Sequence, residues 1–252
     1  MRLIGLLLVA VFVQACAVAP RPDSKVPDRD TKRVVAKRVS AVVVTGRGSL
    51  AAWVRRGFVE NESPDDADGG SATPITGDGY FLTADHVLAN AEGKNVFVLF
   101  GQGGRLRPFK ARVVWRDSKS DLAILKVAAV TPNFYRWTDP GAWLPAGTPV
   151  MHGGIATGFR SQPGRMGTTL PPERAWSRTR SFKMDIPLQP GDSGGPVVDA
   201  YGNLVGINSA VEFLVPMETA FFVDSEAKRP NIRHIEAVIR ADRERSGAAV
   251  RE

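Results

Sequence analysis

The chain has 252 residues, of which 43% are hydrophobic and 23% are charged, and its formal net charge is +7. This balance is that of a globular protein and excludes an intrinsically disordered chain. The length allows one large all-β domain or two small ones.

An export signal is predicted at the N-terminus. Arg2 supplies a positive charge, and an apolar run extends from Leu3 to Val13. This run is too short to cross a bilayer, which takes roughly 20 apolar residues. A positive charge followed by a short apolar run is typical of a secretory signal peptide, so we expect residues 1–15 to be one.

The single cysteine, Cys16, follows Val13-Gln14-Ala15 directly. The arrangement resembles a bacterial lipobox, in which a small residue precedes the cysteine that becomes lipidated, although Gln14 departs from it. We therefore expect a lipid on Cys16 that anchors the protein to the membrane. Ordinary cleavage after the Ala-Cys-Ala group at 15–17 is the alternative. Both hypotheses export the protein, and one cysteine permits no intramolecular disulfide.

Residues 16–37 combine basic side chains with Pro20, Pro22 and Pro27. Prolines keep such a segment extended, and the pattern predicts a flexible, basic linker. Contact of this linker with an anionic lipid surface is an alternative. Nucleic acid is not expected as a partner, because no binding motif accompanies the charge.

Short apolar and β-branched runs follow one another from residue 38 and are separated by Gly, Pro, Asn and Asp. Many short strands divided by turn residues are typical of an all-β barrel or sandwich. No long helical pattern lies between the runs, which disfavours a doubly wound α/β sheet. Two long loops are predicted, at residues 60–70 and 158–181. The clearest strand patterns are RVSAVVVT, GYFLTADHV, NVFVLF, LAILKV and GPVVDAYGNLVGINSAV.

A single helix is predicted near the C-terminus, over about residues 230–246. Ile232, Ile235, Val238 and Ile239 recur there at helical spacing, and Pro230 suits a first turn. The pattern indicates an amphipathic helix that packs on the body of the protein.

Three separate motifs contain the residue types of a nucleophilic hydrolase. His86 lies in LTADHV, Asp121 in SDLAILKV and Ser193 in GDSGGPVV. A serine hydroxyl becomes a good nucleophile when a base takes its proton, and a histidine held by a carboxylate is such a base. The G-x-S-x-G elbow of α/β-hydrolases is a rival interpretation. It requires a helix after the serine, whereas a strand pattern begins here at Pro196.

Together the three motifs resemble the catalytic blocks of trypsin-like serine proteases. GDGYFLTADHV is most similar to the bacterial HtrA/Deg type, and the resemblance extends from about Val39 to Val223. It implies an all-β fold of two antiparallel six-stranded β-barrels followed by the C-terminal helix. The first barrel would take about residues 38–130 and the second about 140–225, within a protease domain at 38–246. No PDZ domain is expected after it, because the remaining residues leave no room.

The same resemblance implies roles for individual residues. His86, Asp121 and Ser193 would form the catalytic triad, and the backbone N–H groups of Gly191 and Ser193 would form the oxyanion hole. Three consecutive residues would pair with an extended peptide substrate by strand addition; they are Asn208, Ser209 and Ala210. Asp192 departs from the Asn usual in the HtrA type. We expect its carboxylate to accept hydrogen bonds from nearby backbone or to pair with an Arg.

The predicted function is that of an exported serine endopeptidase of the bacterial cell envelope or periplasm, which acts on proteins or peptides. A latent or catalytically silent peptide-binding module is the first alternative, and an esterase with the same triad is another. No cofactor is expected, and no metal site is indicated because the sequence has no HExxH motif and no Cys pair. The oligomeric state stays open.

Overall fold

The computed structural model describes residues 25–51, 67–102, 105–137, 144–156, 160–161, 165–168, 180–214 and 221–249. The predicted export signal and the predicted lipidation site at Cys16 lie outside the described residues. So do most of the two long loops predicted at 60–70 and 158–181.

The first sheet closes into a barrel. Its strand order is β2-β1-β5-β6-β7-β4-β3. β2 (Asp68–Ser71) and β3 (Thr73–Pro74) are two parts of one segment divided by Ala72. They stand at the two ends of the strand order, where β2 pairs with β1 and β3 pairs with β4, so this segment closes the barrel. Seven strands therefore make a six-segment barrel, as predicted. The others are β1 (Ser40–Thr45), β4 (Tyr80–Thr83), β5 (Asn95–Gln102), β6 (Arg105–Asp117) and β7 (Leu122–Val127).

Strand β1 is buried along its whole length. Val42 and Val44 point into the core of the first barrel, whereas Ala41 and Val43 pack in a cluster that includes Ile155 of the second half of the chain. Successive side chains of a strand point to opposite faces, so a strand between two cores needs apolar residues at every position. This explains the unbroken SAVVV run in the sequence.

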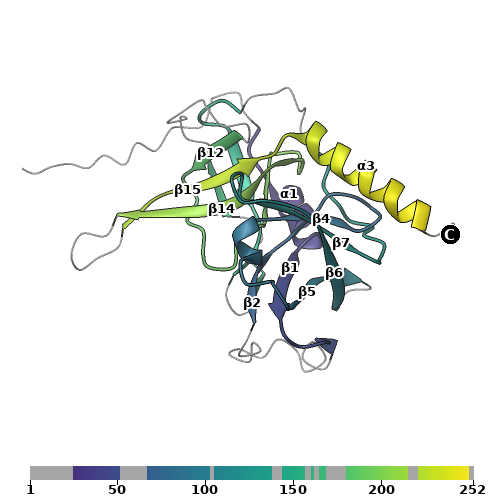
Figure 1. Ribbon diagram of the computed structural model, residues 1–252. Helices are drawn as coiled ribbons and strands as arrows, with labels where there is room; N and C mark the ends of the chain where they lie inside the picture. The colour runs from purple at the N-terminus through teal and green to yellow at the C-terminus, as the bar shows by residue number, and fades with distance from the viewer. Residues whose placement is uncertain are drawn as a thin grey trace, which may run out of the picture.

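The second sheet has six antiparallel strands in the order β11-β8-β13-β14-β15-β12. β14 and β15 form a long hairpin that projects from the body (Figure 1). Beside the sheet, β9 (Ile155–Ala156) pairs with β10 (Arg160–Ser161). The six strands of the sheet are β8 (Pro149–His152), β11 (Arg165–Thr168), β12 (Arg180–Met184), β13 (Pro196–Val198), β14 (Leu204–Leu214) and β15 (Phe221–Arg229).

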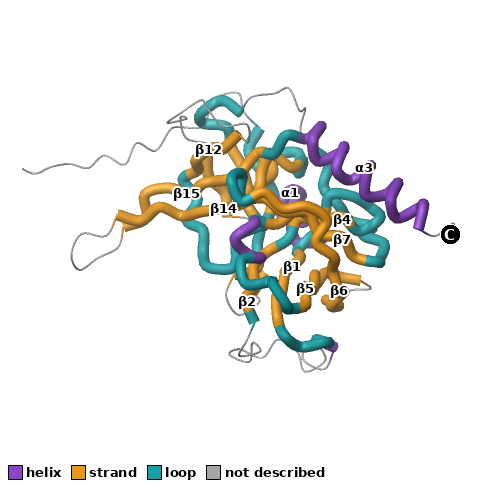
Figure 2. Tube along the Cα trace, in the orientation of Figure 1, coloured by secondary structure: helices purple, strands orange, loops and turns teal. Residues whose placement is uncertain are grey.

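The predicted C-terminal helix is confirmed as α3 (Ile232–Ala249). It follows the last strand of the second sheet and lies along the outside of the first barrel (Figures 1 and 2). Asp242 fixes it there, because its buried carboxylate accepts hydrogen bonds from Tyr80 of β4 and from Arg112 of β6.

The prediction of a flexible linker over 16–37 is wrong for its last part, which is helix α1 (Arg29–Lys37). Asp28 caps the helix through its carboxylate, which accepts the backbone N–H groups of Asp30 and Thr31. Val35 is 1% exposed and belongs to the core cluster, and Thr31 donates to the carbonyl of Ala200 at 3.0 Å. Apart from these two buried side chains, most of the helix is charged, which gives it the composition of a tether.

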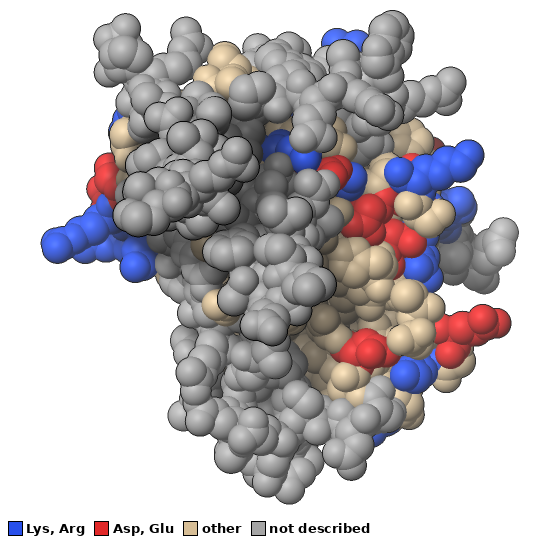
Figure 3. Space-filling view, turned by 90° about the vertical axis from the view of Figure 1, so that its left-hand side faces the viewer, with Lys and Arg blue, Asp and Glu red and all other residues tan. Residues whose placement is uncertain are grey.

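Charged side chains of both signs are interspersed on the described part of the face shown in Figure 3. In the part of the chain that the structure describes, no helix is long and apolar enough to cross a membrane.

Candidate active site

His86 and Asp121 come together because their strands pair. His86 lies in the short 3₁₀ helix η1 (Asp85–Leu88) after β4, and Asp121 directly precedes β7. The register of β4 and β7 places Thr83 opposite Ala123. His86 Nδ1 is 3.0 Å from both carboxylate oxygens of Asp121, and the His86 backbone N–H donates to Oδ1 at 3.0 Å.

Asp121 is held by its surroundings. Its φ of 49° lies in the left-handed region, which Asp tolerates better than most residues with a side chain. Ser209 Oγ donates to its Oδ2 at 2.5 Å. Burial raises the pKa of the Asp121 carboxyl. Hydrogen bonds from the His86 ring, Ser209 and the His86 backbone together lower it by more, so the net pKa lies below its ordinary value. Asp121 is therefore an anion that fixes the imidazole.

Asp85 adds a second carboxylate beside His86. It is buried, and Arg116 of β6 donates to its Oδ1 at 2.6 Å and to its backbone carbonyl at 3.2 Å. The hydrogen bond to Asp121 raises the pKa of His86 above its ordinary value; partial burial opposes this, and the charges of Asp121 and Asp85 support it. The imidazole is thus a stronger base than a free histidine.

The loop at 189–195 leaves two of its N–H groups open. Gly191 and Gly194 have φ values of 98° and 87°, which glycine adopts without strain. Asp192, Gly194 and Gly195 donate their N–H groups to backbone carbonyls at 2.8–2.9 Å. Among the described residues, no acceptor receives the N–H groups of Gly191 and Ser193. Two open donors in one tight turn are what an oxyanion hole requires.

Ser209 connects the three predicted triad residues. Its hydroxyl binds Asp121, and its backbone carbonyl accepts the hydroxyl of Ser193 at 3.3 Å. Within the described part of the chain, Ser193 makes no hydrogen bond to His86. The structure therefore gathers Ser193, His86 and Asp121 around Ser209, with the serine hydroxyl turned to the carbonyl of Ser209.

Asn208 was predicted to offer its backbone to a peptide, and this part of the prediction is wrong. Its N–H donates to the carbonyl of Gly195, and its carbonyl accepts the N–H of Gly194, both at 2.8 Å. These bonds tie β14 to the loop of Ser193 and leave Asn208 no backbone group for a substrate. Its side chain is buried and donates to the carbonyl of Gly153 at 3.2 Å and to that of Asp192 at 3.3 Å. Asn208 supports the loop from behind.

Asp192 is fully buried, and its Oδ2 accepts the backbone N–H of Gln189 at 2.8 Å. Hydrogen bonding to nearby backbone, the first of the two roles expected for it, is thus present. A side chain at Gly154 would place its Cβ 2.4 Å from Oδ1, so glycine is needed at this position for the carboxylate to fit.

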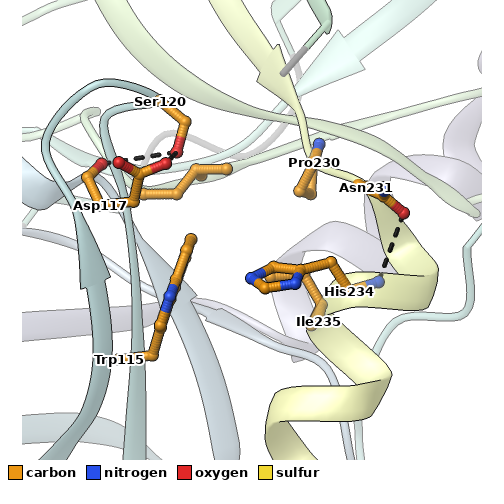
Figure 4. A pocket seen from close by; sticks show the side chains of 8 residues that line it. Trp115, Asp117, Ser120, Pro230, Asn231, His234 and Ile235 are labelled. Atoms are coloured by element: carbon orange, nitrogen blue, oxygen red, sulfur yellow. Dashed lines mark hydrogen bonds between the residues drawn. The ribbon is translucent and has the colours of Figure 1, made fainter. Parts of the chain in front are cut away.

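A separate cavity of about 340 Å³ lies between the turn before β7 and the start of α3 (Figure 4). The rings of Trp115 and His234 meet edge to face in it, with their centroids 5.4 Å apart and their planes inclined by 67°. Asp117 accepts a hydrogen bond from Ser120 at its edge. Its lining does not include Ser193 or His86. In the described residues, no group of three His, Cys, Asp or Glu could hold a metal ion.

Residues 70–207 match the family model of the trypsin-like peptidase domain. This range contains His86, Asp121 and Ser193. The chain belongs to the trypsin-like peptidase family. Membership confirms the resemblance on which the sequence prediction rested.

Relatives of this chain are of the HtrA/Deg type. A probable periplasmic serine endoprotease DegP-like from Hahella chejuensis is 32% identical over 191 residues, which cover 69% of this chain and 37% of the relative. One from Pseudomonas fluorescens is 31% identical over 176 residues, or 63% of this chain and 35% of the relative. The chain thus spans about a third of the length of these curated relatives.

Solved structures share the fold of this chain. The HtrA-type protease AlgW with tripeptide has a TM-score of 0.61 and 23% identity, and the match covers 82% of this chain and 61% of AlgW. The crystal structure of Deg5 has a TM-score of 0.60 and 19% identity, with 84% and 90% covered. The predicted double-barrel fold is thereby confirmed.

Three residues around the candidate site were not predicted from the sequence: Ser71, Asp85 and Arg116. Ser71 binds the loop of Ser193 across 120 positions of sequence, and Arg116 binds Asp85 across 31. Residues so far apart in the chain form no local sequence pattern by which either contact could be predicted. The one available signal was the position of Asp85 directly before His86, where a carboxylate changes the charge around the base.

Proposed function

We propose that this chain is an exported serine endopeptidase that hydrolyses peptide bonds through Ser193, His86 and Asp121. The observation that carries the proposal is the arrangement around Ser209, which binds the carboxylate that holds His86 and also the hydroxyl of Ser193. A nucleophile, a base with a raised pKa and an anion that orients this base are the three parts that acyl transfer needs.

In the proposed reaction, Ser193 Oγ attacks the carbonyl carbon of the substrate while His86 Nε2 takes its proton. The oxyanion that forms would accept hydrogen bonds from the N–H groups of Gly191 and Ser193. His86 then gives the proton to the leaving amine, and the acyl group remains on Ser193. Water, deprotonated by His86, releases the acid. Asp121 stays ionised throughout and stabilises the imidazolium.

Peptides are the proposed substrates, and the cell envelope is the proposed location. The AlgW structures carry peptides, and the DegP-like relatives are named periplasmic. The carbonyl of Ser209 and the backbone of Ala210 are the groups we propose for strand addition, since Asn208 is already engaged. We further propose export by residues 1–15 and membrane anchoring through a lipid on Cys16, for which the lipobox-like sequence is the support.

A latent resting state is the second candidate. It is favoured by the hydroxyl of Ser193, which is bonded to Ser209 and not to His86 in the described residues. A substrate whose N–H binds the Ser209 carbonyl would release that hydroxyl. In a silent peptide-binding module, the hydroxyl of Ser193 would stay bonded to the Ser209 carbonyl after the peptide binds.

Reaction with a fluorophosphonate probe distinguishes these candidates. The purified, exported protein is treated with the probe, and intact mass and peptide mapping locate the adduct, with Ser193→Ala as the control. A single adduct on Ser193 is the result expected of an active triad. A folded protein that forms no adduct, with or without added casein, would contradict the peptidase proposal. An adduct that forms only with casein present would indicate the latent state.

A further inference from the structure

A serine of the first barrel reaches the loop that carries Ser193 in the second. Ser71, the last residue of β2, is fully buried. Its Oγ donates to the carbonyl of Gly191 and accepts the N–H of Ile155, both at 2.7 Å. Its own N–H donates to the carbonyl of Ser193 at 2.8 Å, and its carbonyl accepts the hydroxyl of Thr83 at 2.8 Å. Every polar atom of Ser71 is therefore engaged.

The bond from Ser71 to Gly191 fixes one particular peptide group. The carbonyl of Gly191 and the N–H of Asp192 belong to the same planar unit. Ser71 holds the carbonyl end, and the carbonyl of Gln189 accepts the N–H end at 2.9 Å. This plane separates the two open N–H groups of the loop, those of Gly191 and Ser193. Displacement of this unit would move the Cα atoms of Gly191 and Asp192, and with them the peptide groups on either side that carry the two open N–H groups.

The contact depends on a close approach of the two barrels. A Cβ at Gly70, next to Ser71, would lie 3.0 Å from the carbonyl oxygen of Ser193 and 2.7 Å from a methyl group of Val87. Glycine at this position lets the backbone of β2 lie against the loop. The short side chain of Ser71 then suffices to reach the carbonyl of Gly191.

We propose that Ser71 is a positioning residue of the oxyanion hole. Its hydroxyl holds the peptide plane between Gly191 and Asp192 and so aims the N–H groups of Gly191 and Ser193 at one point. Ser71 touches no substrate, and its role rests on the proposed peptidase activity.

Ser71→Ala tests this role. We expect kcat to fall about 10-fold or more with little change in KM, because loss of a direct oxyanion donor costs about 10²–10³ in kcat and Ser71 acts one step further away. The assay uses a fluorogenic peptide built on a cleavage site mapped in casein. The pH at which activity is half-maximal should not move, since His86 and Asp121 are unchanged.

A peptide boronic acid gives a readout that a merely structural role would not produce. Ser193 Oγ adds to boron, and one boronate oxygen then occupies the oxyanion hole. Its affinity for Ser71→Ala should fall about as much as kcat does, since a transition-state analogue uses the interactions of the transition state. The peptide acid released from the same substrate should bind both proteins equally.

Ser40→Ala is the matched control. Ser40 is a buried serine on the neighbouring strand β1, and its hydroxyl also donates to a backbone carbonyl, that of Arg38 at 3.2 Å. We expect unchanged kcat and unchanged boronate affinity for it. Ser71→Thr keeps the hydroxyl and should restore part of kcat. If Ser71→Ala does not fold, Ser71→Cys, which has similar size and a weaker donor, takes its place with the same expectation of a lower kcat.

Two failures can be told apart. A folded wild-type protein that neither cleaves casein nor reacts with a fluorophosphonate overturns the peptidase proposal, and the role of Ser71 with it. An active wild-type protein together with a Ser71→Ala variant that keeps its kcat within twofold overturns the role of Ser71 alone. So does a variant whose affinity for the product peptide falls in step with that for the boronate.

Discussion

The charge of His86 depends on two carboxylates with different partners. Asp121 binds the ring directly, whereas Asp85 is bound by Arg116 and acts on the ring through its charge. A general base works only when it is neutral, so activity is lost as the pH falls through the pKa of His86. Because that pKa is raised, the loss should begin above the ordinary value of 6.5.

Asp85→Asn should move the acid side of the pH profile of kcat/KM to lower pH. The substitution removes one negative charge that favours the imidazolium, and the charge of Arg116 remains. The measurement is kcat/KM between pH 5 and 9 for the variant and the wild type. Glu236→Gln, which removes an exposed carboxylate on α3, should leave the profile unchanged. A shift to higher pH in Asp85→Asn would refute the electrostatic role of Asp85.

At this scale the sequence identified the residues that lie inside recognisable motifs. His86, Asp121 and Ser193 were named because each has a characteristic neighbourhood, and the structure brings them together. Ser71 and Arg116 act through single hydrogen bonds to distant backbone or side-chain atoms, and no local residue pattern encodes such a bond. Asn208 was misplaced because a strand pattern does not reveal which backbone groups the loop of Ser193 already occupies.

Helix α1 joins the N-terminal segment to the second barrel. Val35 packs directly over Gly153, where an added Cβ would lie only 2.4 Å from a Val35 methyl group. Arg38, at the end of the helix, donates to the carbonyl of Phe134 at 2.8 Å and lies over the ring of Tyr135. The helix therefore contacts both the backbone that follows β8 and residues 134–135, which lie in the chain between the first and the second sheet.

Val35→Ala should lower the free energy of unfolding by about 2 kcal/mol, the cost of removing two fully buried methyl groups and leaving a small cavity. Urea denaturation followed by tryptophan fluorescence measures it. Lys32→Ala, on the exposed side of the same helix, should change the stability by less than about 0.5 kcal/mol. Equal stability of Val35→Ala and wild type would indicate that α1 is not packed on the barrel in solution.

Sequence reasoning missed α1 for a physical reason. A helix of this length buries one narrow stripe, here Thr31 and Val35, and its other positions are mostly charged. The helix therefore contains too few apolar residues at helical spacing to be distinguished in the sequence from a charged linker. The signals that were present are local: Asp28 as the N-cap and Thr31 three residues later, which form a capping box.

On the scale of the whole molecule, α3 connects the end of the second barrel to the outside of the first. Asp242 is the centre of this connection: Arg112 donates to both of its oxygens at 2.8 and 2.9 Å, and Tyr80 donates at 2.9 Å. The hydrogen bonds from Arg112 lower the pKa of Asp242; burial opposes this, and the bond from Tyr80 supports it. Burial and the nearby carboxylate raise the pKa of Tyr80 to about 12.

Asp242→Asn should lower the free energy of unfolding at neutral pH and make it depend less on pH in acid. When folding lowers the pKa of a carboxyl, that carboxyl stabilises the protein at every pH above its pKa in the unfolded chain, here near 3.8. The stabilisation is lost as the pH falls through the pKa that the carboxyl has in the folded protein. We expect a loss of about 2 kcal/mol at neutral pH and a flatter decline of the urea midpoint below pH 4. Asp78→Asn, which breaks the exposed pair with Arg243, should cost less than about 1 kcal/mol.

The architecture was more predictable than its connections. Strands with apolar runs and turn residues between them, together with the three motifs, indicated two barrels, and the solved relatives share that fold. The position of α3 on the first barrel was not predicted, because the periodicity of Ile232, Ile235 and Ile239 shows that a face is buried but not against which partner. That choice depends on Asp242 meeting Tyr80 and Arg112.

The docking of α1 has a consequence for the proposed lipid anchor, because it shortens the chain between Cys16 and the folded domain. If Cys16 carries the proposed lipid, the chain between it and the cap residue Asp28 can span at most about 40 Å. A linker that continued to residue 37 would extend about 75 Å. The shorter segment would keep Ser193 within a thin layer above the bilayer, where proteins emerging from or resting on the membrane would be its nearest substrates.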